Sequence, residues 1–366
     1  MNFSRRFVSS VVQTGPARRF VSFLLQTGLT VTEFTPSQFV QLPEVLAGET
    51  ADVYFLRTRE ILTREGIDPT VTMEFFPSRS GTLCGIREAL DLLKTVAGGA
   101  GLRVEAMDEG APLHPRQVAL RISGRYLAFG IYETALLGIL SQSTGWATAA
   151  RACVEAASPI PVYSFGARHV HPRVAPILDY AAIVGGCVSG STPAGAHLAG
   201  RQPVGTMPHA LILILGDTVA AAEDFDRLMP PGVPRTVLVD TFHDEAEESV
   251  RVAVALGTHL DSVRLDTPVE RGGVTPELVR EVRARLDLAG HPGVQIFVSG
   301  GLTLERLRQF QESGVPIAGF GVGGAISGAP PIDFTADIKA IAGHPIAKRG
   351  RIPGPTPNPA LHEVSW

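Results

Sequence analysis

The sequence predicts an α/β protein with two parts, an α+β domain followed by a domain built on a parallel sheet. Residues 31–145 mix alternating strand patterns with helical segments. A long apolar helical stretch over 132–157 leads into the second part, where short apolar runs alternate regularly with helices after residue 160. Repeated βα units with buried strands are typical of a parallel sheet, either open or closed as a barrel.

The first 30 residues are expected to lie outside this fold. "RRFVSSVVQTG" at 5–15 is followed by a near-copy, "RRFVSFLLQTG", at 18–28, and the first acidic residue is Glu33. We interpret 1–30 as a duplicated leader with no role in the fold. An arginine- and serine-bearing segment without acids also resembles a transit peptide.

In the first domain, alternation and β-branched residues predict strands, and helical spacing closed by glycine predicts helices. The expected strands are 30–34, 71–76, 102–107 and 117–124, and the expected helices lie within 47–66 and 85–99.

In the second domain, the last four strands begin 20–30 residues apart, which is the length of one βα unit. Helices are expected over 244–257, 275–290 and 302–314, each closed by a glycine, and "ALILIL" at 210–215 is expected to be a helix anchored in the core. The expected strands are 161–168, 180–191, 236–242, 261–267, 294–301 and 317–324.

Composition, charge and cysteine content exclude several classes of protein. The 366 residues are 45% hydrophobic and 19% charged with a net charge of −4, so a large core is expected and nucleic-acid binding is not. No run of about 18 apolar residues predicts a membrane helix. Three widely spaced cysteines, Cys84, Cys153 and Cys187, favour a reducing cytoplasm and form no cysteine-based zinc motif.

Polar or glycine residues end each strand predicted after residue 160, and parallel strands bring their carboxyl ends to one edge. Two glycine pairs, with Arg168 and Arg264, favour a phosphate or diphosphate ligand. Asp240 and Asp266 are suited to Mg²⁺ or ribose hydroxyls, although Arg264 and Asp266 can also simply pair with each other. The strand-end groups are Arg168, Ser191, Asp240, Arg264, Asp266, Ser299, Gly300, Gly301, Gly323 and Gly324.

The histidines allow two interpretations. His209 in "GTMPHA" (205–210) is by itself more typical of a packed residue, but the strand-end groups favour a reactive imidazole. His169 and His171 form an H-x-H pair as in metal-dependent hydrolases, yet His197, His209 and His243 do not follow singly at later strand ends. A catalytically silent sugar-phosphate binder is a further alternative.

Ten motifs resemble, in order, those of the nicotinate phosphoribosyltransferases. They span about residues 31–351: "ADVYFLRT", "YETALLG", "SFGARHVHP", "GSTPAGA", "PVGTMPHA", "VDTF", "VRLD", "VSGGL", "GFGVGGAI" and "GHPIAKRGR". The resemblance implies a type II phosphoribosyltransferase fold, in which an N-terminal α+β domain (31–145, rejoined by about 335–366) accompanies an irregular α/β barrel (146–334).

The resemblance also implies an activity and roles for residues. Such enzymes join nicotinate to 5-phosphoribosyl-1-diphosphate with Mg²⁺, giving nicotinate mononucleotide and diphosphate in NAD salvage. ATP hydrolysis is coupled through a phosphohistidine, which matches His209. By the same resemblance, nicotinate is contacted by Phe165, Ser191 and Thr206. It is also contacted by Tyr54, which comes from the other subunit of a homodimer. Phosphoribosyl diphosphate is held by Arg168, Asp240, Arg264, Asp266, Gly300, Gly301, Gly323 and Gly324, with Asp240 and Asp266 near Mg²⁺.

Ser191 bears on the choice of substrate. Nicotinamide-using relatives carry an aspartate at the matching place, and a carboxylate there repels nicotinate, whereas a serine does not. Quinolinate, with a second carboxylate, needs further cationic groups, and the chain lacks the Arg-Lys-Thr stretch of enzymes that use it. Nicotinate is therefore the expected substrate, with quinolinate or nicotinamide as alternatives.

Overall fold

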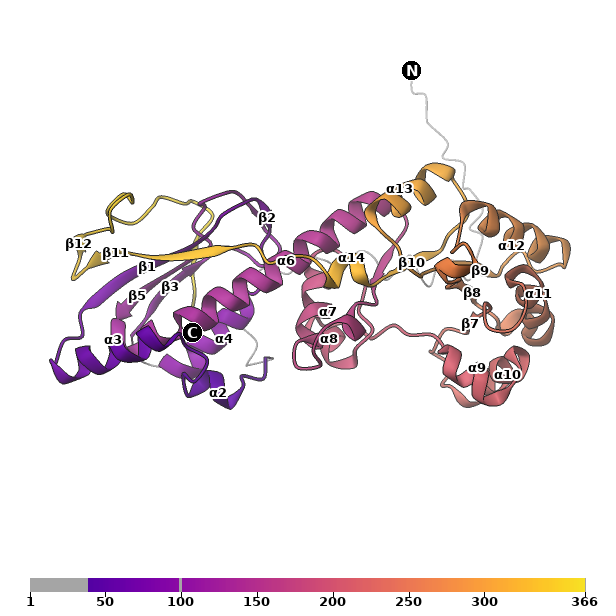
Figure 1. The fold of residues 1–366 in the computed structure, drawn as a ribbon, viewed down its shortest axis with the longest axis horizontal. Helices are drawn as coiled ribbons and strands as arrows, with labels where there is room; N and C mark the ends of the chain where they lie inside the picture. The colour runs from indigo at the N-terminus through magenta and orange to yellow at the C-terminus, as the bar shows by residue number, and fades with distance from the viewer. Residues whose placement is uncertain (1–38, 99–100, 366) are drawn as a thin grey trace, which may run out of the picture. The chain divides into compact units, whose positions relative to one another are not determined.

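The computed structural model describes residues 39–98 and 101–365. The leader and the strand predicted at 30–34 lie outside the described residues. The fold belongs to the predicted α/β class and contains one six-stranded antiparallel sheet and one five-stranded parallel sheet (Figure 1). No helix in the described ranges is both long and apolar enough to cross a bilayer.

The antiparallel sheet gathers strands from both ends of the described chain. Leu120 and Ile122 on one of its strands are buried while their neighbours are partly exposed, the alternation expected of a sheet with one covered face. A two-stranded ribbon, β2 (Gly81–Thr82) and β4 (Pro112–Leu113), is separate. The sheet order is β12 (His344–Pro345), β11 (Phe334–Ile341), β1 (Thr70–Pro77), β5 (Leu120–Arg125), β3 (Arg103–Ala106) and β13 (His362–Glu363).

Helix α4 in the first half of the chain follows the predicted periodicity. Ile86, Ala89, Leu90 and Leu93 of α4 (Ile86–Ala97) are buried at i, i+3, i+4 and i+7. The Glu109 carboxylate accepts the Gly85 and Arg87 backbone N–H groups at the start of that helix. The other elements are α2 (Pro43–Leu46), α3 (Val53–Arg64), α5 (Tyr126–Phe129), η1 (Gly130–Tyr132) and the long α6 (Glu133–Ala157).

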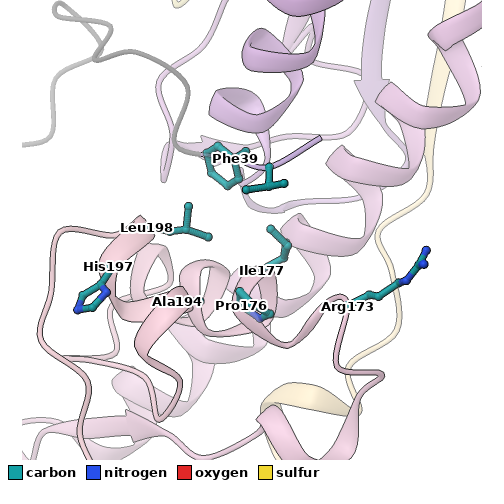
Figure 2. Close-up of a pocket in the computed structure, with 8 residues that line it drawn as sticks. Phe39, Arg173, Pro176, Ile177, Ala194, His197 and Leu198 are labelled. Carbon is teal, nitrogen blue, oxygen red and sulfur yellow. The ribbon is translucent and has the colours of Figure 1, made fainter. Parts of the chain in front are cut away.

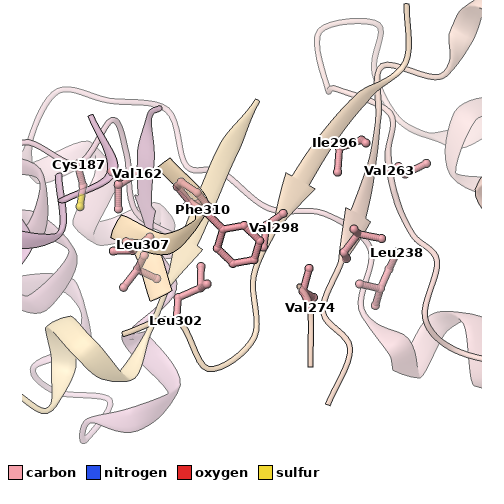
Figure 3. Packing of buried hydrophobic residues seen from close by; sticks show 14 of the residues in the cluster. Val162, Cys187, Leu238, Val263, Val274, Ile296, Val298, Leu302, Leu307 and Phe310 are labelled. Atoms are coloured by element: carbon pink, nitrogen blue, oxygen red, sulfur yellow. The ribbon is translucent and has the colours of Figure 1, made fainter. Parts of the chain in front are cut away.

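The parallel sheet contains five short strands, which correspond to five of the six strands predicted after residue 160. Its order is β6 (Val162–Ser164), β10 (Gly319–Val322), β9 (Gln295–Val298), β8 (Ser262–Leu265) and β7 (Thr236–Leu238). Leu238, Val263, Ile296 and Val298 from three of these strands are buried in one apolar cluster (Figure 3). By the register of β8 and β9, Val263, Ile296 and Val298 lie on one face of the sheet, which apolar side chains cover.

Helices between these strands begin at side-chain caps. Asp244, Thr275 and Thr303 accept a backbone N–H at the starts of α11 (Glu245–Leu256), α12 (Pro276–Leu288) and α13 (Leu304–Ser313). The remaining elements are η2 (Ala167–His169), α8 (Pro193–Leu198), α10 (Thr218–Leu228), η3 (Gly257–His259), η4 (Val269–Arg271) and α14 (Gly324–Ser327).

The strand predicted at 180–191 is wrong over its first part. Residues 175–184 form helix α7 (Ala175–Val184), in which Tyr180, Ala181 and Ala182 are buried. Residues 188–190 run beside β6: the Val188 N–H donates to the Val162 carbonyl, the Ser189 carbonyl accepts the Ser164 N–H, and Gly190 forms a parallel bridge with Ser164. Apolar residues of a buried helix read like a buried strand, and the alanines favour the helix. The Gly190 carbonyl accepts the Val204 N–H, so residues 190 and 204 extend the sheet irregularly beyond β6.

The predicted core anchor at 210–215 is correct as a helix but wrong in its burial. Helix α9 (His209–Leu215) buries only Ile212, whereas Leu213, Ile214 and Leu215 are exposed. A helix of two turns meets the core along a single stripe, and its neighbours point elsewhere.

Candidate functional site

The carboxyl ends of the parallel strands carry most of the predicted site residues. Phe165 follows β6, Asp240 lies two residues after β7, and Arg264 with Asp266 spans the end of β8. Ser299 and Gly323 follow β9 and β10 directly. The strand order makes these ends neighbours, which is where parallel α/β proteins bind their ligands.

Arg264 is the centre of a hydrogen-bond network. Its Nε donates to Ser299 Oγ at 2.8 Å, and its Nη1 donates to Thr206 Oγ1 at 2.9 Å. Its Nη2 lies 3.3 Å from Asp266 Oδ2. A guanidinium has five N–H donors, so these contacts hold the group in place and leave donors for a ligand anion. The sequence allowed the pairing of Arg264 with Asp266 as an alternative to ligand binding, and the structure contains this pair.

An aromatic ring lies against this guanidinium. The Arg264 Cζ is 5.1 Å from the centre of the Phe165 ring, and Phe165 stacks on Phe297 at 5.9 Å between centroids. A Cβ at Gly321 would come within 2.4 Å of the Phe165 ring, so the adjacent strand needs glycine there. The half-buried ring therefore contacts one guanidinium and one phenyl ring, and a flat aromatic ring is a group on which a planar ligand stacks.

His209 and Asp240 form a second pair. His209 Nε2 lies 3.2 Å from Asp240 Oδ2, with the imidazole 40% exposed and the carboxylate 1% exposed. Burial raises the pKa of Asp240, an effect that His209 opposes and the charge of Asp266 adds to. Asp240 Oδ1 is buried and has no hydrogen-bond partner among the described residues, so the carboxylate has one oxygen available to a ligand.

The first glycine pair forms a tight turn against Asp266. Gly300 and Gly301 have φ angles of +86° and +57°, and a Cβ at Gly300 would lie 3.2 Å from Asp266 Oδ1. Arg306 donates from Nη1 to both glycine carbonyls, at 3.3 and 3.4 Å. The turn is therefore fixed in shape, with its carbonyls already hydrogen-bonded.

The second glycine pair is next to His169. A Cβ at Gly323 would lie 2.8 Å from His169 Cε1, and His169 Nδ1 is 3.1 Å from Ser327 Oγ. Gly324 is the first residue of α14. His171, the other residue of the H-x-H pair, accepts the Arg173 N–H at its Nδ1. Within 39–98 and 101–365 no three histidine, cysteine or acidic side chains are grouped as a metal site.

Three predicted residues are not drawn into the network. Arg168 is exposed in η2, Ser191 is half-buried after the Gly190 bridge, and Tyr54 on α3 is 55% exposed with its hydroxyl donating to Asp52. Their predicted roles stay predictions.

The network contains one predicted strand-end group that was given no role and two residues that the sequence analysis did not identify. Ser299, the predicted group, links Arg264 to Asp266, because its Oγ also lies 2.7 Å from Asp266 Oδ1. Phe297 supports Phe165, and Arg306 holds the glycine turn. Alternation on β9 places Phe297 and Ser299 on one face, which is a signal that was available in the sequence.

A pocket of about 410 Å³ lies elsewhere, against α7 and α8. Figure 2 shows Phe39, Ile177 and Leu198 around it, and none of the predicted site residues line it. We therefore build the site from the strand-end contacts and not from this cavity.

Comparisons with known proteins agree with the arrangement of two domains. A family model for the quinolinate phosphoribosyl transferase C-terminal domain matches residues 146–337, and one for the N-terminal domain of the same enzyme matches residues 52–144. Together they cover more than half of the chain.

Similar proteins carry related names. Nicotinate phosphoribosyltransferase pncB2 of Mycobacterium tuberculosis is 32% identical over 256 residues, which are 67% of this chain and 54% of that protein. The chain thus spans about half the length of the curated relatives it matches. A solved structure of a nicotinate-nucleotide pyrophosphorylase from Pyrococcus furiosus has 45% identity and a TM-score of 0.79, covering 90% of this chain and 86% of that one. Human nicotinic acid phosphoribosyltransferase, at 19% identity and a TM-score of 0.65, covers 83% of this chain and 77% of its own and shares the fold.

Proposed function

The chain belongs to the quinolinate phosphoribosyl transferase family, and we propose that it transfers the 5-phosphoribosyl group of phosphoribosyl diphosphate to nicotinate. The products are nicotinate mononucleotide and diphosphate. One observation supports this most: Arg264 is held by three partners at the strand ends with its face against Phe165. An anion and a flat ring are the two ligand features that such a pair recognises.

Nicotinate is favoured over its amide by the neutral side chain of Ser191 and by the names of the curated relatives. The second candidate is quinolinate, which the family name favours. The name of the Pyrococcus furiosus enzyme fits either acid, since both reactions give nicotinate nucleotide. The second carboxylate of quinolinate needs an additional cation, and the side chain of Arg264 is already shared with Asp266.

Asp240 and Asp266 fit a divalent cation. Asp240 Oδ1 is a buried oxygen without a partner among the described residues, and the two carboxylates are close enough for the charge of Asp266 to raise the pKa of Asp240. Mg²⁺ favours one or two carboxylates together with substrate phosphates. When bound, it would neutralise charge on the diphosphate.

The residues then act by position and charge. Stacking against Phe165 orients the pyridine so that its ring nitrogen faces C1 of the ribose, and a C–N bond forms as the C–O bond to diphosphate breaks. Arg264 and Arg168 stabilise the negative charge on the departing diphosphate. The turns at Gly300–Gly301 and Gly323–Gly324 offer backbone N–H groups to phosphate oxygens.

We propose that ATP phosphorylates His209. With Nε2–H donating to Asp240, the lone pair lies on Nδ1 of the partly exposed ring. Attack of Nδ1 on the γ-phosphorus releases ADP and forms a phosphohistidine, and water then hydrolyses it to phosphate. The buried carboxylate stabilises the positive ring during both steps.

Two further proposals concern the assembly and its location. Tyr54 is exposed on α3 and is not drawn into the strand-end network of its own chain, so we propose a homodimer in which it reaches the partner's site. We also propose a cytoplasmic location, supported by three free, buried cysteines.

The test is an assay of the purified protein with nicotinate, nicotinamide and quinolinate, each with phosphoribosyl diphosphate and Mg²⁺, with and without ATP. Nicotinate mononucleotide formed from nicotinate, faster with ATP, is the expected result. Formation of nicotinate mononucleotide and carbon dioxide from quinolinate alone identifies the second candidate. Activity on none of the three refutes the proposed function.

A further inference from the structure

A buried carboxylate outside the strand-end network contacts the chain next to Phe165 and next to Ser191, which are two of the proposed nicotinate contacts. Asp179 lies in the middle of α7 with its side chain completely buried. Its Oδ1 accepts the Ser164 hydroxyl at 2.7 Å, and its Oδ2 accepts both the N–H and the hydroxyl of Thr192 at 2.8 Å. Asp179 makes no ion pair within the part of the chain that the structure describes, so these hydrogen bonds offset the cost of burying its polar side chain.

The backbone is packed closely around this carboxylate. A Cβ at Gly190 would come within 2.5 Å of Asp179 Cγ, and one at Gly195 within 2.6 Å of Asp179 Cβ. Both glycines let the segment after the Gly190 bridge approach Asp179 closely. That segment and the end of β6 therefore contact the same side chain from two directions.

Each partner of Asp179 is adjacent to a residue of the proposed nicotinate site. Ser164 precedes Phe165, and Thr192 follows Ser191. We propose that Asp179 is a positioning residue that sets the spacing between Phe165 and Ser191, and with it the fit of the pyridine acid. This inference rests on the proposed function and deepens it.

Backbone hydrogen bonds connect this segment to further residues along the same edge of the sheet. The Ser164 N–H donates to the Ser189 carbonyl, and the Gly190 carbonyl accepts the Val204 N–H. Val204 lies two residues before Thr206, which receives Arg264. Displacement of the 189–192 segment is thus expected to affect the pyridine first and the diphosphate only through this longer connection.

Ser164→Ala tests the proposal, with Ser262→Ala as the matched control. Each serine is buried and hydrogen-bonded through its hydroxyl. Ser262, however, pairs with Thr236 at the amino ends of β7 and β8, whereas the candidate site lies at the carboxyl ends. In Ser164→Ala, KM for the pyridine acid is expected to rise about 10-fold, equivalent to about 1.4 kcal/mol, with KM for phosphoribosyl diphosphate within about 2-fold of wild type. In Ser262→Ala, both KM values are expected to stay within about 2-fold while Tm falls.

Variants of Asp179 complete the test. Asp179→Asn keeps an acceptor for Thr192 and offers its amide to the Ser164 oxygen, so it should retain most of the wild-type KM, whereas Asp179→Ala should not. If Asp179→Ala does not fold, the Ser164→Ala comparison still decides. Two results overturn this inference but leave the proposed function intact. One is an equal rise of both KM values in Ser164→Ala, and the other is a pyridine KM of Ser164→Ala equal to that of Ser262→Ala. A wild type inactive on every pyridine acid overturns the proposed function as well.

Discussion

Replacement of Arg264 by lysine tests the network most directly. The guanidinium makes three contacts, to Ser299, Thr206 and Asp266, at 2.8, 2.9 and 3.3 Å. A lysine ammonium keeps the charge but reaches one of these partners in place of three, and it has no planar face for Phe165. Because the side chain is only 11% exposed, water does not replace the lost bonds fully.

The expected magnitude follows from these contacts. Two lost hydrogen bonds at about 0.5–1.5 kcal/mol each reduce the free energy of unfolding by about 1–3 kcal/mol. The loss of a positioned fork for the departing diphosphate is expected to cost about 2.7 kcal/mol in transition-state stabilisation, or about 100-fold in kcat/KM.

The assay compares kcat/KM for phosphoribosyl diphosphate in wild type, Arg264→Lys and Arg280→Lys, with unfolding by denaturant measured in parallel. Arg280 is an exposed arginine that pairs with Glu277 on α12, so its replacement controls for the change from arginine to lysine. Its kcat/KM is expected within about 2-fold of wild type. A similarly small effect in Arg264→Lys would refute the role given to the network.

Three further predictions follow from other parts of the structure. His209→Ala is expected to abolish ATP stimulation while slow ATP-independent synthesis remains; ATP hydrolysis still coupled to product formation in this variant contradicts the phosphohistidine. Ser191→Asp is expected to lower the nicotinate-to-nicotinamide ratio of kcat/KM about 10-fold, and an unchanged ratio removes the substrate argument. Burial, together with the charges of Glu109 and Asp91, raises the pKa of Glu88 from 4.5 to about 7, so the folded state holds this proton more tightly. The stabilising contribution of the protonated Glu88 side chain is therefore lost as pH rises from 4.5 through 7. The free energy of unfolding of Glu88→Gln should exceed that of wild type by about 1–2 kcal/mol at pH 8 but not at pH 4; a difference that is the same at every pH contradicts this prediction.

Most elements of the second domain were predictable because each βα unit carries its own signals. The helices 245–256, 276–288 and 304–313 combine an apolar stripe with a terminal glycine and a Thr or Asp cap, all of which are local. The first part of the region 180–191 was predicted wrongly because "YAAIVGG" is apolar throughout, and periodicity does not separate a buried helix from a buried strand.

The grouping of the candidate site residues was predictable, but most of their contacts were not. The rule that parallel strands end at one edge was enough to group Asp240, Arg264 and Asp266. It did not predict that Arg264 bonds Thr206, which is 58 residues away, or that Arg306 holds the glycine turn. Those contacts depend on how the 190–208 segment crosses the end of the sheet, which has no periodic signal.

The sequence by itself determined most of the alternation of strands and helices after residue 230 and the chemical groups at the strand ends, because side-chain periodicity, caps and turn glycines act over a few residues. Only the tertiary structure decided which groups meet: Arg264 with Thr206, His209 with Asp240, and Asp179 with both Ser164 and Thr192. Those pairs depend on strand register and on the path of irregular segments. Both are set by packing across the whole domain, and no short stretch of sequence encodes them.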